Sequence, residues 1–356
     1  MSEQLATFLT GLAIIAGFIF LIVVHEFGHY IVAKISNIKV TDFFVGFGPK
    51  LWTFKKGETT YGIAAIPLGG YVKMAGSDVL DDEDKSIDDE RGLAKASLTK
   101  KIFIIMAGST MNIVVAFILL SIVAGFYGIT VPTTKVAGTT KGLPAEKALL
   151  KGDKIIRIND KKIRDWKTLS SEIKRHREKK IAIEIVRKKQ NISLTLKTVI
   201  KDNEAIIGIW PQQKKVRNLT FAESIKSGAN AVYFFGSTVT ILIYKGITGQ
   251  SSEIVKGSTS IIGAVAIGAT TTETVLEYLG FIGMISLALA YINLVPLPPL
   301  DGGRAAIYVF EKVIGRPLKK NAIIGIMAFG LALVLLLMIY LVGKDIFIIA
   351  TNRSFY

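Results

Sequence analysis

Cysteine is absent from this sequence, and histidine is nearly so, with three in 356 residues. Without cysteine the chain cannot form a disulfide framework, and it cannot bind a metal through thiolates. A metal site in this protein must therefore use histidine, aspartate or glutamate side chains. Because histidines are so few, the spacing between any two of them is informative.

Charged residues are sparse over long stretches of the chain. Half of the residues are hydrophobic and the mean hydropathy is +0.46, which is high for a soluble protein. Four apolar runs, 5–24, 102–131, 274–297 and 322–350, are each long enough to cross a bilayer as a helix. No Lys or Arg precedes the first run, so we expect a retained helix rather than a cleaved signal peptide. The sequence predicts a multi-pass α-helical membrane protein with about four transmembrane helices.

Two segments between these runs have a different character. Residues 40–76 alternate glycine with aromatic and β-branched residues, which favours strands joined by turns. We expect a β-hairpin or small β-sheet associated with the membrane. Residues 219–248 are typical of an amphipathic helix that lies on the membrane surface or barely enters it.

The net charge of +16 is concentrated in residues 135–217. Alternating strands without interleaved stacking aromatics argue against a nucleic-acid partner. The pattern favours a basic, solvated domain, with membrane lipid headgroups attracting part of the charge. Basic residues in the short loops 34–101 and 304–320 place both loops in the cytoplasm. Both termini and the region 135–270 are then expected to be extracytoplasmic.

Two of the three histidines lie at the end of the first apolar run, in the stretch HEFGH. On a helix His25 and His29 share a face, so both imidazoles can bind one Zn²⁺. Glu26 is offset from that face and can act as general base toward a water at the open position of the metal. The alternative is a pair of helix-terminal histidines that the helix dipole favours. For His176, in the basic segment SEIKRHREKK, we expect a structural role.

A catalytic zinc needs a third protein ligand, and with no cysteine a carboxylate is expected. Asp301, in NLVPLPPLDGG where the third apolar run breaks, is the best candidate; a helix N-cap is the alternative. Asn293, earlier in the same stretch, could hold the substrate backbone or the oxyanion, or could simply pack between helices. Asn112 is a polar residue inside the second run and could line the same substrate-binding cavity.

Together these stretches resemble a known family. HEFGH and NLVPLPPLDGG resemble the motifs of the site-2 protease family of intramembrane zinc metalloproteases. GFGPKLW and IPLGGYVKM resemble the membrane-associated β-sheet of its bacterial branch, which includes the regulator of sigma-E protease. GLPAEKALLKGDKIIRINDKKI resembles the core of a bacterial PDZ domain. The resemblance covers nearly the whole chain.

The resemblance implies one catalytic zinc held by His25, His29 and Asp301, with Glu26 as the catalytic residue and Asn293 in contact with substrate. It implies an enzyme of the bacterial cytoplasmic (inner) membrane. Family members cut single-span membrane proteins, typically anti-sigma factors already trimmed by another protease, or remnant signal peptides. The PDZ domain is thought to restrict access by size.

The expected architecture has four parts. Residues 1–132 hold the first two transmembrane helices and the β-hairpin region, and 133–201 form an extracytoplasmic PDZ-like α+β domain. Residues 202–272 form the surface helix and a connection, and 273–356 hold the last two transmembrane helices. Two other functions are open. One is a catalytically silent membrane scaffold that holds partners through its PDZ domain. The other is a metal-ion transporter, although the internal repeats common in transporters are not visible.

Overall fold

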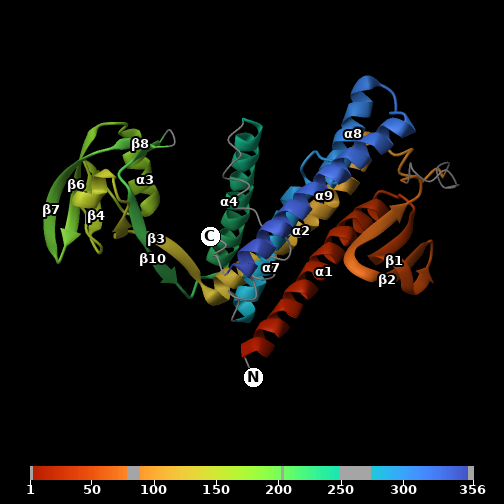
Figure 1. Ribbon diagram of the computed structural model, residues 1–356, viewed down its shortest axis with the longest axis horizontal. Coiled ribbons are helices and arrows are strands. Elements are labelled where there is room, and N and C mark those ends of the chain that lie inside the picture. The colour runs from red at the N-terminus through yellow and green to blue at the C-terminus, as the bar shows by residue number, and fades with distance from the viewer. Residues whose placement is uncertain (1–2, 78–88, 202–203, 249–273, 352–356) are drawn as a thin grey trace. The chain divides into compact units, whose positions relative to one another are not determined.

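A computed structural model describes residues 3–77, 89–201, 204–248 and 274–351 of the chain (Figure 1). Residues 202–203 and 249–272 of the predicted 202–272 segment lie outside the described residues. The chain divides into two compact units, which we describe separately. One combines the two ends of the chain, up to Ala124 and from Thr220, and the other is Gly125–Leu219.

Four long apolar helices dominate the first unit. They are α1 (Glu3–Ile35), α2 (Leu98–Tyr127), α7 (Val275–Asn293) and α9 (Lys320–Ala350). Within the described ranges, these four helices are long and apolar enough to cross a membrane, with mean hydropathy from 1.9 to 2.9 over their most apolar windows. The predicted number and places of the long apolar helices are confirmed.

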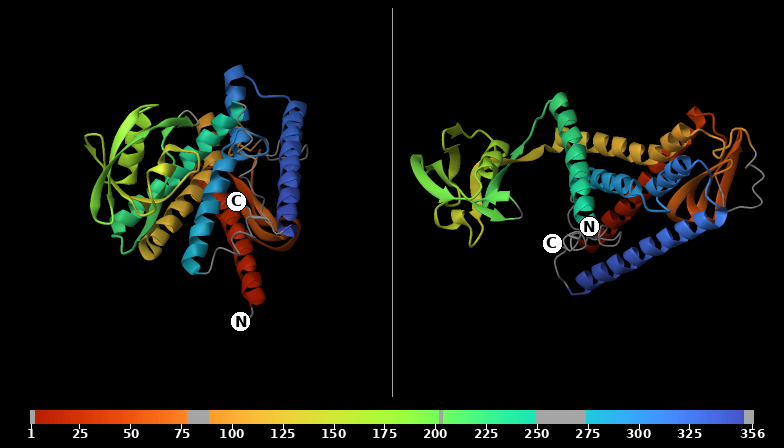
Figure 2. Two further views of the ribbon diagram at one scale, coloured as in Figure 1. Left: turned by 60° about the vertical axis from the view of Figure 1, so that its left-hand side comes forward. Right: turned by 90° about the horizontal axis from the view of Figure 1, so that it is seen from above.

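Glycines allow α1, α2 and α7 to approach one another closely. Gly17 of α1 lies against Ile282 of α7, and Gly28 lies against the carbonyl of Ala107 on α2. Gly283 of α7 lies against Leu120 of α2. A larger side chain at these positions would push the helices apart, because packed interiors have little spare volume. The three helices lie side by side, and α1 and α2 run in opposite directions (Figures 1 and 2).

Two further helices belong to this unit. α8 (Asp301–Ile314) begins at Asp301. α4 (Phe221–Ile247) is not among the candidate spans. It packs on α2 and α7, since its Gly228 lies against Ser121 and its Gly236 against Tyr291. The sequence predicted a helix here, and the structure places it beside two candidate spans.

The β region consists of two long bent strands, β1 (Val40–Lys56) and β2 (Thr59–Met74). Gly46 and Gly48, with φ of 91° and 84°, allow β1 to bend in a conformation that other residues disfavour. Each strand bends into two arms, and the arms of β1 alternate with the arms of β2 across the sheet. The segment 40–45 pairs with 70–74 on one side and with 60–63 on the other, and 50–56 pairs with 59–64. The outer arms of this small sheet are therefore 66–74 and 50–56.

The second unit is a compact α+β domain. Its main sheet has the order β10-β3-β4-β6-β7, with β5 paired to β4. The strands are β3 (Ile129–Thr139), β4 (Lys154–Ile158), β5 (Lys161–Lys162), β6 (Lys180–Arg187), β7 (Gln190–Lys197) and β10 (Ile209–Val216). A short 3-10 helix (Pro144–Lys147), helix α3 (Trp166–Arg175) and the pair β8 (Val199–Lys201) and β9 (Glu204–Ile206) complete it. Because β10 pairs with β3, the domain continues past residue 201.

The core of this unit is aliphatic. Ile155, Ile158, Leu169, Ile181, Ile183 and Ile185 are all fully buried. The three isoleucines of β6 occupy alternate positions, as expected for a strand with one buried face. On β4, Ile155 and Ile158 lie three residues apart because the register shifts between Ile155 and Arg157. Both strands pack with Leu169 of α3 in one cluster. The sequence predicted an α+β domain over 133–201, and this unit has an α+β architecture.

A buried ion pair ties the start of β4 to the end of β6. Asp153 is 1% exposed and accepts hydrogen bonds from the Arg187 guanidinium at 2.7 and 2.8 Å and from the Leu150 N–H at 2.7 Å. Burial opposes ionisation of this carboxyl, but its partners more than offset that effect and lower the pKa of Asp153 below its ordinary value.

We expect Asp153→Asn to destabilise this unit by about 3 kcal/mol, because it leaves the Arg187 charge without its buried partner. The depressed pKa gives stability that is present above the unfolded-state pKa and is lost as pH falls through the folded-state value. Urea unfolding followed by the fluorescence of Trp166 and Trp210 would measure both effects. Equal midpoints for the variant and wild type at pH 7 would contradict the prediction.

Candidate active site

Three predicted residues from distant parts of the chain converge at one point. His25 and His29 lie one turn apart on α1, and Asp301 is the first residue of α8. Asp301 Oδ2 lies 3.0 Å from His25 Nε2 and 3.3 Å from His29 Nε2. The two Nε2 atoms are 3.1 Å apart. Both histidines are buried, each 8% exposed.

The sequence around Asp301 explains how it reaches α1. After α7 ends at Asn293, the proline-rich segment 294–300 turns back over the start of α8. Gly302 lies directly against the carbonyl oxygens of Leu294 and Val295, and Gly303 lies against Pro298. A side chain at either glycine would collide with this turn, so the Gly-Gly pair lets the turn close and hold Asp301 in place.

The donor set fits a zinc ion. Among the residues that the structure describes, His25, His29 and Asp301 form the one group of three or more such side chains able to share a metal. A tetrahedral zinc with ligand bonds near 2.0–2.1 Å places its ligand atoms about 3.3 Å apart. The three observed separations, 3.0 to 3.3 Å, lie close to that value. Asp301 Oδ2 is buried without a hydrogen-bond partner, as expected of an atom whose partner is a cation.

The second nitrogen of His29 is fixed by the protein. His29 Nδ1 lies 2.7 Å from the carbonyl oxygen of Ile104 on α2, to which it donates in the tautomer that leaves Nε2 free. Outer partners of this kind orient a metal-binding imidazole and increase its basicity. His25 Nδ1 is buried and has no such partner.

Gly108 of α2 is a site residue that the sequence analysis missed. A Cβ atom there would lie 2.7 Å from both Cε1 and Nε2 of His25, and closer still to Nε2 of His29. The two imidazoles therefore occupy the space that a side chain at 108 would fill. Nothing in the stretch MAGSTMN marks this glycine from the sequence alone, because its role depends on α2 packing across α1.

Glu26 lies between the histidines and the β-sheet. Its Cγ would be 3.1 Å from a Cβ at Gly70, and Ile22, one turn earlier on α1, also borders Gly70. The outer arm 66–74 of β2 thus passes directly beside Glu26. A carboxylate next to two imidazoles and an outer strand can serve a reaction on an extended peptide.

The remaining predicted residues lie in different surroundings. Asn293 is half-buried at the end of α7, before the turn that leads to Asp301. Asn112 is 1% exposed and lies on α2, one turn beyond Gly108. His176 lies in the second unit, where Nε2 is 3.2 Å from the Asn159 amide and Nδ1 is 2.9 Å from the Glu172 carbonyl. Its contacts match the structural role expected for it.

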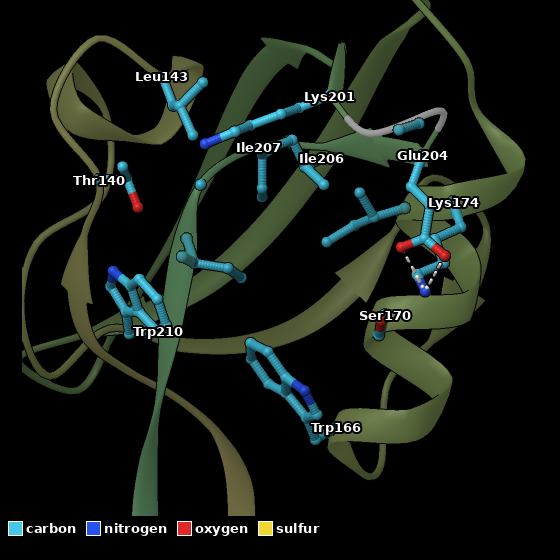
Figure 3. Close-up of a pocket in the computed structure, with 14 residues that line it drawn as sticks. Thr140, Leu143, Trp166, Ser170, Lys174, Lys201, Glu204, Ile206, Ile207 and Trp210 are labelled. Carbon is cyan, nitrogen blue, oxygen red and sulfur yellow. Dashed lines mark hydrogen bonds and ion pairs between the residues drawn. The ribbon is translucent and has the colours of Figure 1, made fainter. Parts of the chain in front are cut away.

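A separate groove of about 340 Å³ lies in the second unit (Figure 3). It runs between α3 and the segment 204–210, and its lining includes Trp166, Ile207 and Trp210. Lys174 and Glu204 pair across one end at 2.7 Å. The groove shares no lining residue with the His25–His29–Asp301 cluster.

Comparisons with known proteins agree with this site. The model for Peptidase family M50 matches residues 13–337. The chain is 34% identical over 333 residues to a Clostridium acetobutylicum protein named "Putative zinc metalloprotease", covering 92% of this chain and 94% of the relative. It is 26% identical over 426 residues to the zinc metalloprotease RasP of Geobacillus kaustophilus, covering 97% and 99%.

A solved PDZ domain of an SdrC-like protein from Listeria monocytogenes is similar to 23% of this chain and is covered over 90% of its own length. At 20% identity and a TM-score of 0.21 this likeness is too slight to support a statement about fold. The family match is different, because it spans most of the sequence and both metal motifs. The chain therefore belongs to peptidase family M50, the family of the site-2 proteases, and is a zinc metalloendopeptidase.

Proposed function

We propose that this protein is an intramembrane endopeptidase that cuts single-span membrane proteins within or near their transmembrane segment. The observation that carries the proposal is the convergence of Asp301, at the start of α8, with His25 and His29, which lie on a helix long and apolar enough to cross a bilayer. Ionisable groups are costly at such depth and generally mark function. We expect substrates of the anti-sigma factor or remnant signal peptide type, trimmed beforehand by another protease.

His25, His29 and Asp301 would hold one zinc ion, which would supply Lewis acidity to the attacking water and the scissile carbonyl. Glu26 accepts a proton from that water and passes it to the leaving amine, because its carboxylate lies beside the two imidazoles without joining the cluster. Asn293, at the end of α7, is positioned by the same turn as Asp301 and would contact the substrate backbone.

The β-sheet would prepare the substrate for cleavage. A transmembrane helix has its carbonyls hydrogen-bonded internally, so it must unwind before a bond can be cut. The arm 66–74 pairs with β1 on one side and passes Glu26, so an unwound segment could add to it as a strand. Residues 61–63, in the earlier arm of β2, are paired on both sides and offer no free edge. The edge is therefore confined to the later arm.

We expect Val72→Pro to slow cleavage of a helix-stable substrate about 10-fold more than cleavage of one whose helix is broken by Gly-Pro, because proline removes a backbone donor from the strand. Thr53→Pro, in the opposite outer arm 50–56, is the matched control. Initial rates on the two substrates, for each variant, would measure the effect. Equal slowing of both substrates by Val72→Pro would reject strand addition.

The proposed location is the bacterial cytoplasmic membrane, with lipid as the surrounding partner. The basic loops at each end of the spans support a cytoplasmic position for residues 34–101 and an extracytoplasmic position for both termini and the PDZ-like unit. Since the chain has no native cysteine, single cysteines introduced at Asn191 and at Lys95 would report their side by labelling with an impermeant maleimide in intact cells.

The direct test is cleavage of a model single-span substrate by the purified protein in liposomes. Treatment with a chelator should abolish cleavage, and added Zn²⁺ should restore it. A protein that holds zinc but cuts no substrate, pre-trimmed ones included, would favour the second candidate function. That candidate is a silent scaffold, and the groove between α3 and 204–210 is the feature that supports it.

A further inference from the structure

Several buried polar atoms of α1 and α2 have no hydrogen-bond partner. In the described part of the chain, His25 Nδ1, Ser109 Oγ and both side-chain heteroatoms of Asn112 are buried without a hydrogen-bond partner. Asn112 is 1% exposed and Ser109 is 0% exposed. Leaving a buried polar group unpaired is costly, so such atoms are normally paired with each other or with water.

The two metal-binding histidines differ in their outer contacts. His29 Nδ1 has the Ile104 carbonyl as its acceptor, but His25 Nδ1 has no protein acceptor. When Nε2 binds a metal, Nδ1 carries a proton that needs an acceptor. Metal-binding histidines almost always have one, from a carboxylate, a carbonyl or a water. The site therefore needs one more acceptor near His25.

The packing of α1, α2 and α7 places Asn112 close to His25, whose Nδ1 lacks an acceptor. Gly17 lies against Ile282, so one turn further along both helices Leu21 and Ser286 share a layer. Ser286 Oγ donates to the Asn112 carbonyl at 2.8 Å, which puts Asn112 in that layer. His25 and Gly108, which are in contact, form the next layer.

The direction in which helical side chains lean brings the side chains of His25 and Asn112 toward each other. Side chains on a helix lean toward its N-terminus. Because α1 and α2 are antiparallel (Figure 2), His25 leans toward the layer of Asn112, and Asn112 leans toward the layer of His25. Gly108 contributes no side chain between them.

We propose that Asn112 is a positioning residue for the metal site, whose Oδ1 accepts the His25 Nδ1 proton directly or through one water that Ser109 also binds. This inference rests on the zinc site proposed above. The positioning role replaces the substrate contact that the sequence predicted for Asn112, because a side chain that is 1% exposed does not reach a substrate. Asn112 thus does for His25 what the Ile104 carbonyl does for His29.

The test compares zinc affinity, measured by competition with a chelator, in wild type and in Asn112→Leu, Asn112→Asp and Ser121→Ala. Leucine matches asparagine in size but accepts no hydrogen bond, so we expect zinc affinity to fall about 10- to 100-fold. Aspartate keeps the acceptor and should hold zinc within about 3-fold of wild type. Ser121, buried on the same helix, donates to the Phe117 carbonyl and has no other hydrogen-bond partner among the described residues, so it serves as the control. If Asn112→Leu does not fold, Asn112→Ala takes its place.

Thermal unfolding of the metal-free proteins separates positioning from packing. If Asn112 positions His25, the rise in Tm on adding zinc should be smaller in Asn112→Leu than in wild type, whereas a packing defect alone would lower the Tm of the metal-free and the zinc-bound protein equally. Wild-type zinc affinity in Asn112→Leu, or equal loss in Asn112→Asp, would overturn the proposal and leave the protease intact. A raised KM with unchanged zinc affinity would also overturn it and restore the substrate contact. Absence of zinc from wild type would overturn both.

Discussion

Replacing Glu26 by glutamine should leave zinc bound and reduce cleavage about 1,000-fold, within the range of about 10²–10⁴ typical of a lost general base. Glu26 lies outside the group formed by His25, His29 and Asp301, so the amide removes no ligand. It also fills the same space beside Gly70. The loss should therefore appear in kcat, with KM close to its wild-type value.

Zinc content by elemental analysis and cleavage of a single-span substrate would be measured on the same preparations. Glu184→Gln, in the second unit where Glu184 pairs with Arg157 on the surface, is the control carboxylate and should cleave normally. Wild-type activity in Glu26→Gln would exclude the base assigned here. If neither wild type nor the variant cleaves although both bind zinc, the scaffold function gains support.

The substitution Gly108→Ala should abolish zinc binding, although it adds one methyl group. The new Cβ would lie 2.7 Å from two atoms of the His25 ring, inside van der Waals contact, so the imidazoles must move. A displacement near 1 Å in a catalytic arrangement can cost about 100-fold in rate. Alanine otherwise favours a helix over glycine by about 1 kcal/mol, so weakening of α2 is not the cause.

Gly325→Ala is the matched control, because Gly325 lies in the apolar helix α9 with nothing within 4 Å of its Cβ position. Zinc content, cleavage and thermal unfolding of the metal-free protein should all match wild type in this variant. For Gly108→Ala we expect a folded protein with neither zinc nor cleavage. A Gly108→Ala protein with full zinc content would show that the cluster tolerates a side chain there, and that the close approach of α2 is not required.

The amino-acid sequence by itself determined the apolar spans and the chemical identity of the site. A transmembrane helix needs a run of about 20 apolar residues, which is visible as composition. His25, Glu26 and His29 lie on one helix, so their relative placement follows from helical periodicity alone. The chemistry of Asp301 also follows from the sequence, since the absence of cysteine leaves a carboxylate as the expected third ligand.

Only the tertiary structure decided which backbone and small residues complete the site. Gly108, the Ile104 carbonyl and Gly70 contribute no distinctive side chain, so no local pattern distinguishes them. Their roles arise where α2 and the arm 66–74 of β2 pack against α1, and such packing depends on contacts between residues far apart in the chain. The sequence also left open which arms of β1 and β2 pair with each other. Several registers satisfy the alternation of residue types in 40–76 equally well, so only the packed sheet selects one.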